Sequence, residues 1–286
     1  MPTIDGLLLV DKPAECTSHD VVAVARRALG VKRVGHGGTL DPFATGLLVL
    51  LVGRATRLLP YLEGEPKVYE ATIRLGAETD TDDRTGSVVR TAPVPDRAVV
   101  EQAMRGLTGA VDQRPPAYSA KQVAGQRAHA AARRGSPLDL APASVTVHAW
   151  VARAWRERDV DVTVTCSGGT YVRALARDVG RAAGSAAHLA ALRRLRSGPF
   201  DIRDAATLDA LRGGTPAMLP PVAAVPSMPV VALDADSVRQ VRQGRDVPGA
   251  DGGADRAALV DHAGALVAIA QRTGDWWHAR TVLADD

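Results

Sequence analysis

The sequence predicts an α+β protein, and three observations lead to this class. Residues 69–75 and 160–165 alternate apolar and polar side chains with period two, which is typical of strands with one buried face. Residues 19–29 have helical spacing instead, between Thr17, which can cap a helix start, and Gly30, which can end one. Five prolines between residues 216 and 229 mark a linker to a short β-rich tail.

Composition limits the function classes. The 286 residues, 46% of them apolar, can bury a sizeable core, but no apolar run reaches the roughly 18 residues of a membrane helix and no signal peptide is evident. A net charge of +3 and a pI near 9.1 suit a nucleic-acid partner without requiring one. Cys16 and Cys166 are far apart in sequence, so we expect two small buried thiols in a reducing compartment.

Two apolar segments near the N-terminus predict buried strands. Residues 7–10 form a short run that Pro13 ends, and residues 47–52 form an uninterrupted run typical of a fully buried segment. Lys12, at the end of the first run, is either a solvated turn residue or, if it faces the following loop, a contact for phosphate.

The segment 35–46 lies before the second run and holds the candidate reactive group. Its four glycines and one proline exclude a regular helix or a central strand, so we expect a loop held against buried structure. A rigid scaffold presents reactive side chains on such loops, and Asp41 is the candidate. The alternative is a tight turn in which Asp41 caps a backbone amide ahead of Pro42.

Other familiar motifs are not matched by this loop. Position 40 is Leu where the dinucleotide-binding fingerprint requires glycine, and no P-loop pattern occurs in the chain. A zinc site built on His36 and Asp41 would need distant ligands, because neither Cys nor a second His stands nearby at metal spacing.

The middle of the chain contains an acidic segment and a basic segment. Residues 79–86 fail as a calcium loop because Thr85 stands where glycine is needed, so we expect an acidic surface turn. A helix should run from Asp96 to about residue 107. Residues 122–134 predict a second helix beside Lys121, rich in alanine and arginine and weakly packed, which is either a mobile basic flap or a plain solvated helix.

Arginine recurs every four residues at positions 173, 177 and 181, which stacks three cations along one helical face. We expect a buried carboxylate to pair with Arg173 and nucleic-acid phosphate to meet the other two, unless the stripe is simply solvated. A further helix is predicted over residues 185–195, with three arginines near its C-terminal end.

Six ordered stretches resemble the TruB family of tRNA pseudouridine synthases. They are residues 9–13 with 17–20, then 35–46, 67–69, 115–121, 168–173 and 192–194. The match extends from Leu7 to about Pro226, and the tail resembles a PUA-like RNA-binding module less closely. The resemblance implies a mixed, mainly antiparallel sheet with flanking helices in a catalytic domain over residues 1–226. It also implies a thumb-like insertion at about 115–143 and a PUA-like domain over residues 227–286.

The activity that the resemblance implies is conversion of uridine 55 in the tRNA T loop to pseudouridine, without a metal or an organic cofactor. The aspartate matching Asp41 attacks the sugar C1′ or the base C6, or removes a ribose proton, and the sequence leaves these open. Arg173 matches an active-site arginine that holds this carboxylate in place. Tyr69 matches a tyrosine that stacks on the flipped uracil.

Other site residues are carried over in the same way. His36 matches a histidine that braces the space left by displaced bases, and Tyr171 and Leu192 match positions lining the uracil pocket. Lys121 corresponds to the RNA-gripping thumb, and Lys12 is expected to bind substrate. The implied partner is the T stem-loop of tRNA, for a cytoplasmic monomer that needs no membrane and no obligate protein partner. The rival interpretation is a protein that grips tRNA without chemistry.

Overall fold

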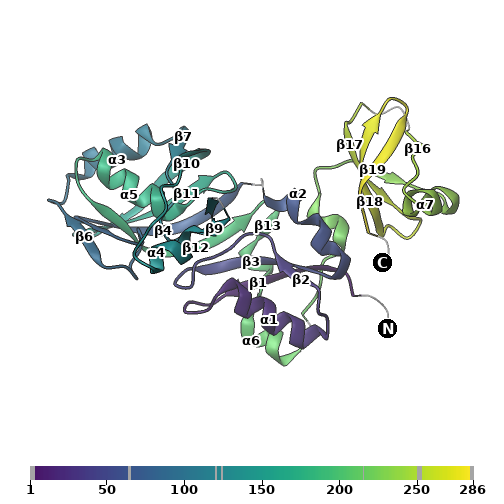
Figure 1. Cartoon of the computed structure of the whole chain (residues 1–286), viewed down its shortest axis with the longest axis horizontal. Helices are drawn as coiled ribbons and strands as arrows, with labels where there is room; N and C mark the ends of the chain where they lie inside the picture. Colours follow the sequence, from purple (N-terminus) through teal and green to yellow (C-terminus); the bar gives the residue numbers. More distant parts are fainter. Residues whose placement is uncertain are drawn as a thin grey trace. The chain divides into compact units, whose positions relative to one another are not determined.

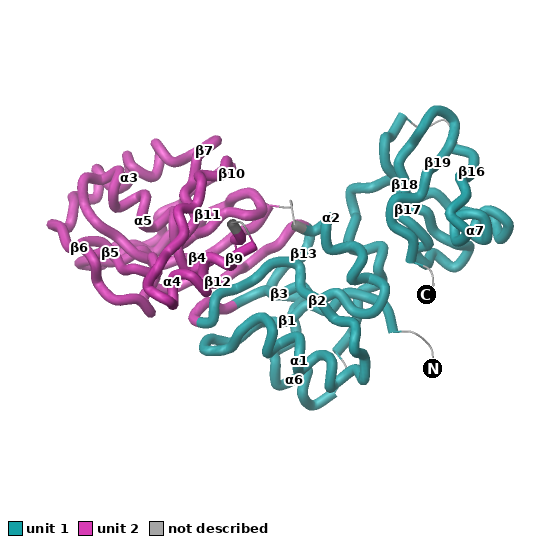
Figure 2. Tube along the Cα trace, viewed as in Figure 1, with its two compact units in different colours: residues 1–42, 46–63, 199–286 teal, residues 43–45, 64–198 magenta. Residues whose placement is uncertain are grey.

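The computed structural model describes residues 4–63, 66–119, 121–123, 125–214, 216–249 and 253–283. The chain divides into two compact units (Figure 2). Unit 1 comprises residues 1–42, 46–63 and 199–286, and unit 2 comprises residues 43–45 and 64–198. The two parts of the chain that flank unit 2 therefore belong to one unit. The domain division at residue 226 stays a prediction.

Unit 1 is built on a layer of strands. β1 (Gly6–Lys12) pairs in parallel with β14 (Ala206–Thr207) and antiparallel with β3 (Thr45–Val52), which also pairs with β2 (Val34–His36). The two apolar runs are thus strands, as the sequence predicts. β13 (Phe200–Asp201) and the short helices η1 (Gly53–Leu58), α2 (Leu59–Glu63), η2 (Ile202–Asp204) and η3 (Pro221–Ala224) complete this part.

Helix α1 (Ser18–Leu29) begins and ends where its sequence signals predict. The Thr17 hydroxyl accepts a hydrogen bond from the Asp20 amide, and the Asp20 carboxylate accepts one from the Thr17 amide. Gly30 ends the helix at φ 64°. The apolar face of α1 packs with α6 (Leu208–Gly213) on Leu8, Val10, Leu48, Leu50 and Val52.

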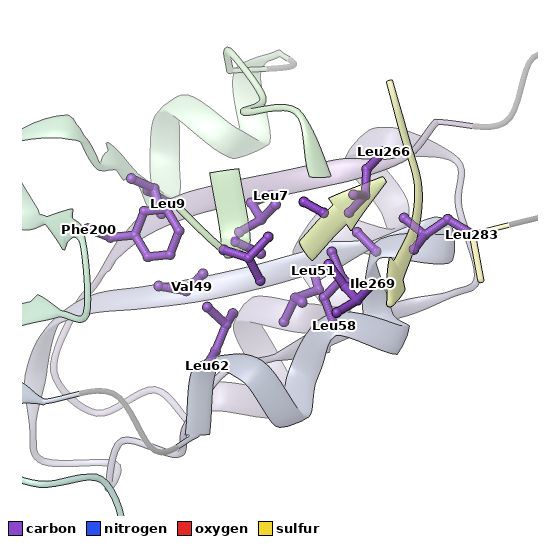
Figure 3. Close-up of a cluster of buried hydrophobic side chains, with 14 of the residues drawn as sticks. Leu7, Leu9, Val49, Leu51, Leu58, Leu62, Phe200, Leu266, Ile269 and Leu283 are labelled. Carbon is purple, nitrogen blue, oxygen red and sulfur yellow. The ribbon is translucent and has the colours of Figure 1, made fainter. Parts of the chain in front are cut away.

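The opposite face of the same strands is also buried, which explains why residues 47–52 carry no polar side chain. Leu7, Leu9, Val49 and Leu51 pack there with Leu58 and Leu62, and residues from the tail, among them Leu266, Ile269 and Leu283, complete the cluster (Figure 3). Arg57 Nη1 donates to the Val282 carbonyl at 2.7 Å, and the Tyr61 and Thr281 hydroxyls lie 2.9 Å apart. The tail therefore forms part of the core of unit 1.

The tail forms a five-stranded sheet (yellow in Figure 1). The strand order is β15 (Val230–Ala232), β17 (Arg256–Val260), β18 (Leu266–Thr273), β19 (Trp276–Val282) and β16 (Val247–Pro248). Helix α7 (Ala235–Arg242) packs on it through Val238 and Val241, and Trp277 is buried in the same cluster. The prediction of a β-rich tail with one helix is confirmed.

Unit 2 contains an antiparallel sheet with helices packed on it (Figure 1). Its order is β12 (Ala187–Ser197), β4 (Lys67–Leu75), β11 (Asp159–Cys166), β10 (Ala143–Trp155) and β7 (Gly109–Gln113). Tyr69, Ala71, Ile73 and Leu75 are buried along β4, as the period-two pattern predicts. Helices α3 (Arg97–Gly106) and α5 (Val172–Ala182) and the hairpin β5 (Ala77–Thr79)–β6 (Val88–Thr91) complete the unit.

The helix predicted over residues 185–195 is wrong, because this segment is strand β12. It pairs with β4 along its length, but the register shifts between Leu189 and Ala191 and again between Arg194 and Arg196. Each shift changes which face of the strand the next residue occupies. The first shift places Leu189 and Leu192, three positions apart, on the same face of β12, and together with Leu195 this spacing imitates a helical period.

The insertion differs from its prediction in two ways. A hairpin of β8 (Gln122–Val123) and β9 (Gln126–Arg127) precedes α4 (Ala128–Arg133), so the helix begins six residues later than expected. Ala128, Ala131 and Ala132 are buried, so the small side chains do pack, contrary to expectation. The basic side chains of Lys121, Arg127, Arg133 and Arg134 are exposed. Ala120 and Ala124 lie outside the described residues.

Candidate active site

The loop that carries Asp41 is shorter than the sequence suggests. β2 extends to His36 and β3 begins at Thr45, and the Gly37 amide donates to the Val49 carbonyl at 2.8 Å. The irregular segment is therefore residues 37–44, and Asp41 lies half-buried within it. The pairing of β2 with β3 fixes the two ends of this loop. A loop that presents a reactive side chain needs such fixed ends.

The residues on either side of Asp41 are held by buried side chains. The Ser18 hydroxyl, 1% exposed at the start of α1, accepts from the Leu40 amide at 2.9 Å and donates to the Leu40 carbonyl at 3.1 Å. Lys12 Nζ donates to the carbonyl of Pro42 at 3.3 Å. The backbone is thus fixed one residue before Asp41 and one residue after it.

The placement of Lys12 contradicts its expected role as a phosphate contact. Its side chain is fully buried, and Nζ also donates to the carbonyls of Pro13 at 2.9 Å and Cys16 at 2.6 Å. A buried ammonium surrounded by carbonyl oxygens braces the backbone. His36, at the end of β2, is half-buried, and its ring lies edge-on to the His19 ring at a centroid distance of 5.4 Å.

The three arginines of α5 face carboxylates from the acidic segment. Arg173 Nη1 lies 3.4 Å from Asp83 Oδ2, Arg177 Nη1 lies 2.7 Å from Asp82 Oδ2, and Arg181 Nη2 lies 2.8 Å from Glu78 Oε2. We call this set the arginine–carboxylate ladder. The segment 79–86 does form a turn in which Asp80 is exposed, but Glu78, Asp82 and Asp83 are each less than 10% exposed, so the expectation of surface acids is wrong for Asp82 and Asp83. Arg177 and Arg181, for which phosphate partners were expected, both pair with internal carboxylates, although the Arg181 side chain is 55% exposed.

Arg173 is the first arginine of the ladder, and its guanidinium has fixed partners. Nη1 donates to the Thr81 carbonyl at 2.9 Å and Nη2 donates to the Tyr118 carbonyl at 3.0 Å. Asp83 is itself anchored, since its Oδ1 accepts from the Thr85 amide at 2.9 Å and from the Thr81 hydroxyl at 2.9 Å. The orientation of the Arg173 side chain is therefore determined before any substrate binds.

Burial raises the pKa of Asp82 to about 6, and the Arg177 guanidinium opposes that rise. Burial also raises the pKa of the Cys166 thiol to about 11, which keeps it a neutral core group. Cys16 is half-exposed rather than buried, so the expectation of two buried thiols holds for Cys166 alone. Within the described residues, no three His, Cys, Asp or Glu side chains gather as a metal site.

Tyr69 and Leu192 lie on neighbouring strands of the unit 2 sheet. Tyr69 is 6% exposed on β4, and Leu192 is 8% exposed on β12, where it pairs with Ala71. Tyr171 immediately precedes α5, and both of its backbone groups bind the side chain of Gln113. Lys121 is exposed in the insertion. Unit 2 therefore holds Tyr69, Arg173, Tyr171, Leu192 and Lys121, while unit 1 holds Asp41, His36 and Lys12.

Sequence reasoning did not identify the ladder carboxylates, Ser18 or Gln113. The ladder had a usable signal, because acids at 78 and 82 repeat the four-residue spacing of the arginines. Ser18 and Gln113 had none, since a single polar residue in a strand or at a helix start is ordinary.

The fold resembles single chains of two solved complexes. The chain aligns with one chain of a Cbf5–Nop10–Gar1 complex at a TM-score of 0.73 and 27% identity, covering 98% of this chain and 85% of that one. A chain of an H/ACA RNP bound to a substrate RNA containing 2′-deoxyuridine gives a TM-score of 0.72 at 25% identity, with 98% and 85% covered.

Two family models cover much of the chain. The TruB family pseudouridylate synthase N-terminal domain matches residues 26–172, and the tRNA pseudouridylate synthase B C-terminal domain matches residues 173–215. By class, the fold and the family-model matches are those of a pseudouridylate synthase.

Curated relatives refine that class. A protein of Thermobifida fusca is 49% identical over 253 residues, which are 85% of this chain and 86% of the relative. One of Cutibacterium acnes is 48% identical over 279 residues, 92% of each chain. Both are named tRNA pseudouridine synthase B. The chain belongs to the TruB family of pseudouridylate synthases, so the resemblance found in the sequence is confirmed.

Proposed function

We propose that this protein isomerises uridine 55 in the T loop of tRNA to pseudouridine. Family membership and relatives named tRNA pseudouridine synthase B support tRNA as the substrate. The observation that carries the proposal is the fixed backbone on both sides of Asp41, through Ser18 and Lys12. Binding alone does not require an acid in a preorganised loop, whereas exchange of a glycosidic bond requires a placed carboxylate.

The reaction needs the uridine to leave the T loop, which costs a few kcal/mol. Stacking on an aromatic ring returns about 1–3 kcal/mol, and Tyr69 is the residue proposed for this contact. Leu192 and Tyr171 are proposed to line the uracil site and His36 to brace the vacated space. Asp41 then attacks the sugar C1′ or the base C6, or removes a ribose proton that is later returned. In each case the bond between C1′ and N1 breaks and a bond between C1′ and C5 forms, while C5 loses its proton and N1 gains one.

Arg173 is proposed to hold the Asp41 carboxylate. Its guanidinium bears a positive charge and is oriented by the carbonyls of Thr81 and Tyr118. A preorganised cation stabilises a neighbouring anion without further rearrangement. A double-mutant cycle on Asp41 and Arg173 measures this pairing, and additive losses in the two single variants would contradict it.

The exposed basic residues of the insertion supply the proposed grip on tRNA. Lys121, Arg127, Arg133 and Arg134 are available for phosphate, whereas Arg177 and Arg181 are held in the ladder. The tail is proposed to act as a PUA-like RNA-binding module. We infer a cytoplasmic monomer. In the described part of the chain, no helix has the length and apolar character needed to cross a membrane.

The deciding experiment incubates the protein with unmodified tRNA transcript, with chelator and without added metal, and maps pseudouridine. Asp41→Asn should abolish the product while tRNA affinity stays within about tenfold. Asp96→Asn is the matched control, because Asp96 is exposed and makes no side-chain cap for α3. Product formation by Asp41→Asn would overturn the catalytic assignment. Tight binding without product by the native chain would favour the RNA-binding rival, and activity lost with chelator would favour a metal-dependent reaction.

A further inference from the structure

Gln113 makes a two-point contact with the backbone of Tyr171. It is the last residue of β7, and its side chain is 1% exposed. Its Oε1 accepts from the Tyr171 amide at 2.8 Å, and its Nε2 donates to the Tyr171 carbonyl at 3.0 Å. A side-chain amide has one acceptor and one donor side, so it can satisfy both backbone groups of one residue.

The position that Gln113 holds is the entry to α5. β11 ends at Cys166, the chain turns through Gly169 at φ 80°, and α5 begins at Val172. Tyr171 is the N-cap residue of α5, its side chain makes no cap hydrogen bond, and its amide donates to Gln113 Oε1. The Tyr171 carbonyl also accepts from the Leu175 amide at 3.1 Å, as the first turn of the helix.

The residues after Gln113 bind the same helix. The Arg114 carbonyl accepts from Arg177 Nη2 at 2.9 Å, and the Tyr118 carbonyl accepts from Arg173 Nη2 at 3.0 Å. The segment 113–118 therefore touches α5 at its entry and at two of its arginines. It leads directly into the insertion, whose basic residues are proposed to hold tRNA.

We propose that Gln113 is a positioning residue for the uridine-isomerising site. It fixes the backbone of Tyr171 and the first turn of α5, and through them the direction of the Tyr171 ring and the Arg173 guanidinium. This inference rests on the proposed function. Glutamine suits this position because its side chain offers both a donor and an acceptor at the required reach. An ionised glutamate would place a negative charge against the Tyr171 carbonyl oxygen, and leucine has neither a donor nor an acceptor. Asparagine is one methylene shorter.

Two substitutions test the proposal, Gln113→Leu and Gln113→Glu, with single-turnover pseudouridine formation at saturating tRNA as the main readout. Gln113→Leu should slow the reaction about 100-fold, the loss expected for a displacement of about 1 Å at a reacting centre. The tRNA dissociation constant should change by less than about threefold, because the grip lies elsewhere. Gln113→Glu should be as slow as Gln113→Leu at high pH and recover as pH falls, since a protonated carboxyl group can donate to the Tyr171 carbonyl.

Two controls separate positioning from loss of stability or added charge. Val160→Ala removes core volume at the other end of β11, where the residue is fully buried, and it should lower the melting temperature without the rate loss. Gln102→Glu adds the same charge at an exposed position on α3. Should Gln113→Leu fail to fold, the pH profile of Gln113→Glu decides the matter.

The proposal is overturned if Gln113→Glu reacts within about threefold of the native rate at all pH values. It is also overturned if Val160→Ala and Gln113→Leu lower the melting temperature equally and slow the reaction equally. Weakening of tRNA binding by the same factor as the rate would also overturn it. An inactive native protein would refute the proposed function and, with it, this inference. An active native protein with unimpaired Gln113 variants would refute the inference alone.

Discussion

Arg177 and Asp82 form an ion pair of 2.7 Å inside unit 2, with side chains that are 8% and 10% exposed. The pair is the middle step of the arginine–carboxylate ladder, between Arg173 with Asp83 and Arg181 with Glu78. Three stacked cations would repel one another along α5, and the acidic segment neutralises them from within the protein. The ladder therefore serves to orient α5, and the proposed RNA contacts lie elsewhere.

Loss of the Arg177 guanidinium should destabilise the protein strongly. Arg177→Met leaves Asp82 buried without its main partner, for which about 3–5 kcal/mol is typical. Arg181→Met is the matched control: the Arg181 side chain is 55% exposed, and Glu78 keeps Arg90 as a partner at 3.0 Å. We expect Arg181→Met to lower the free energy of unfolding by less than half of the loss in Arg177→Met. Urea unfolding of both variants measures these losses. Equal losses of stability would contradict the expectation that the more buried ion pair contributes more.

Asp82 should give the folding stability a defined pH dependence. Its folded pKa of about 6 lies above the ordinary 3.8, so the folded state binds the extra proton and its stability falls as pH rises through this window. The free energy of unfolding falls by up to about 3 kcal/mol between pH 4 and pH 6, and this contribution of Asp82 no longer changes above pH 6. Asp82→Asn should remove this slope in urea unfolding measured from pH 4 to pH 8. A variant with the native slope would place the titration in another group.

Ser18 should matter for activity more than its size suggests. Ser18→Ala removes both hydrogen bonds to Leu40, and each buried group left unsatisfied costs about 1–3 kcal/mol. Because Leu40 precedes Asp41, we expect pseudouridine formation to slow by about tenfold or more. Ser185→Ala is the control: this serine is equally buried, and its hydroxyl donates to the Pro93 carbonyl at 2.6 Å in unit 2. A rate loss shared by both variants would indicate a general effect of stability.

Binding of tRNA should weaken as salt rises, because cations that contact phosphate release counterions. Replacing Lys121 with Gln should reduce the slope of log affinity against log salt by about 1, and adding Arg127→Gln and Arg133→Gln should reduce it further. Arg212→Gln, an exposed arginine of α6 paired with Asp209, is expected to leave the slope unchanged. Filter binding at several salt concentrations measures this. An unchanged slope in the insertion variants would place the grip elsewhere.

The sequence predicts those parts of the fold that depend on neighbouring residues. The caps Thr17 and Gly30, the alternation along β4 and the loop around Asp41 are all local patterns, and the structure contains each of them. The family resemblance, read from ordered motifs, is confirmed as well.

The rest depends on partners far away along the chain. Residues 79–86 look like a surface turn because Asp82 and Asp83 pair with arginines that lie ninety or more positions later in the chain. β12 looks helical because its two register shifts hide the strand period. Lys12 looks like a free cation, although a carbonyl thirty residues away helps to bury it. The roles assigned to Asp41, Tyr69, Tyr171 and Leu192 stay predictions.

The cluster beneath β1 and β3 sets an order of events for synthesis of this chain. Leu7 and Leu9 emerge from the ribosome long before Ile269 and Leu283, which pack against them in the same cluster. The scaffold under β1 and β3 thus stays incomplete until the segment that carries Ile269 and Leu283 has been translated. A nascent chain that stalls before the tail would expose a leucine-rich surface that chaperones bind.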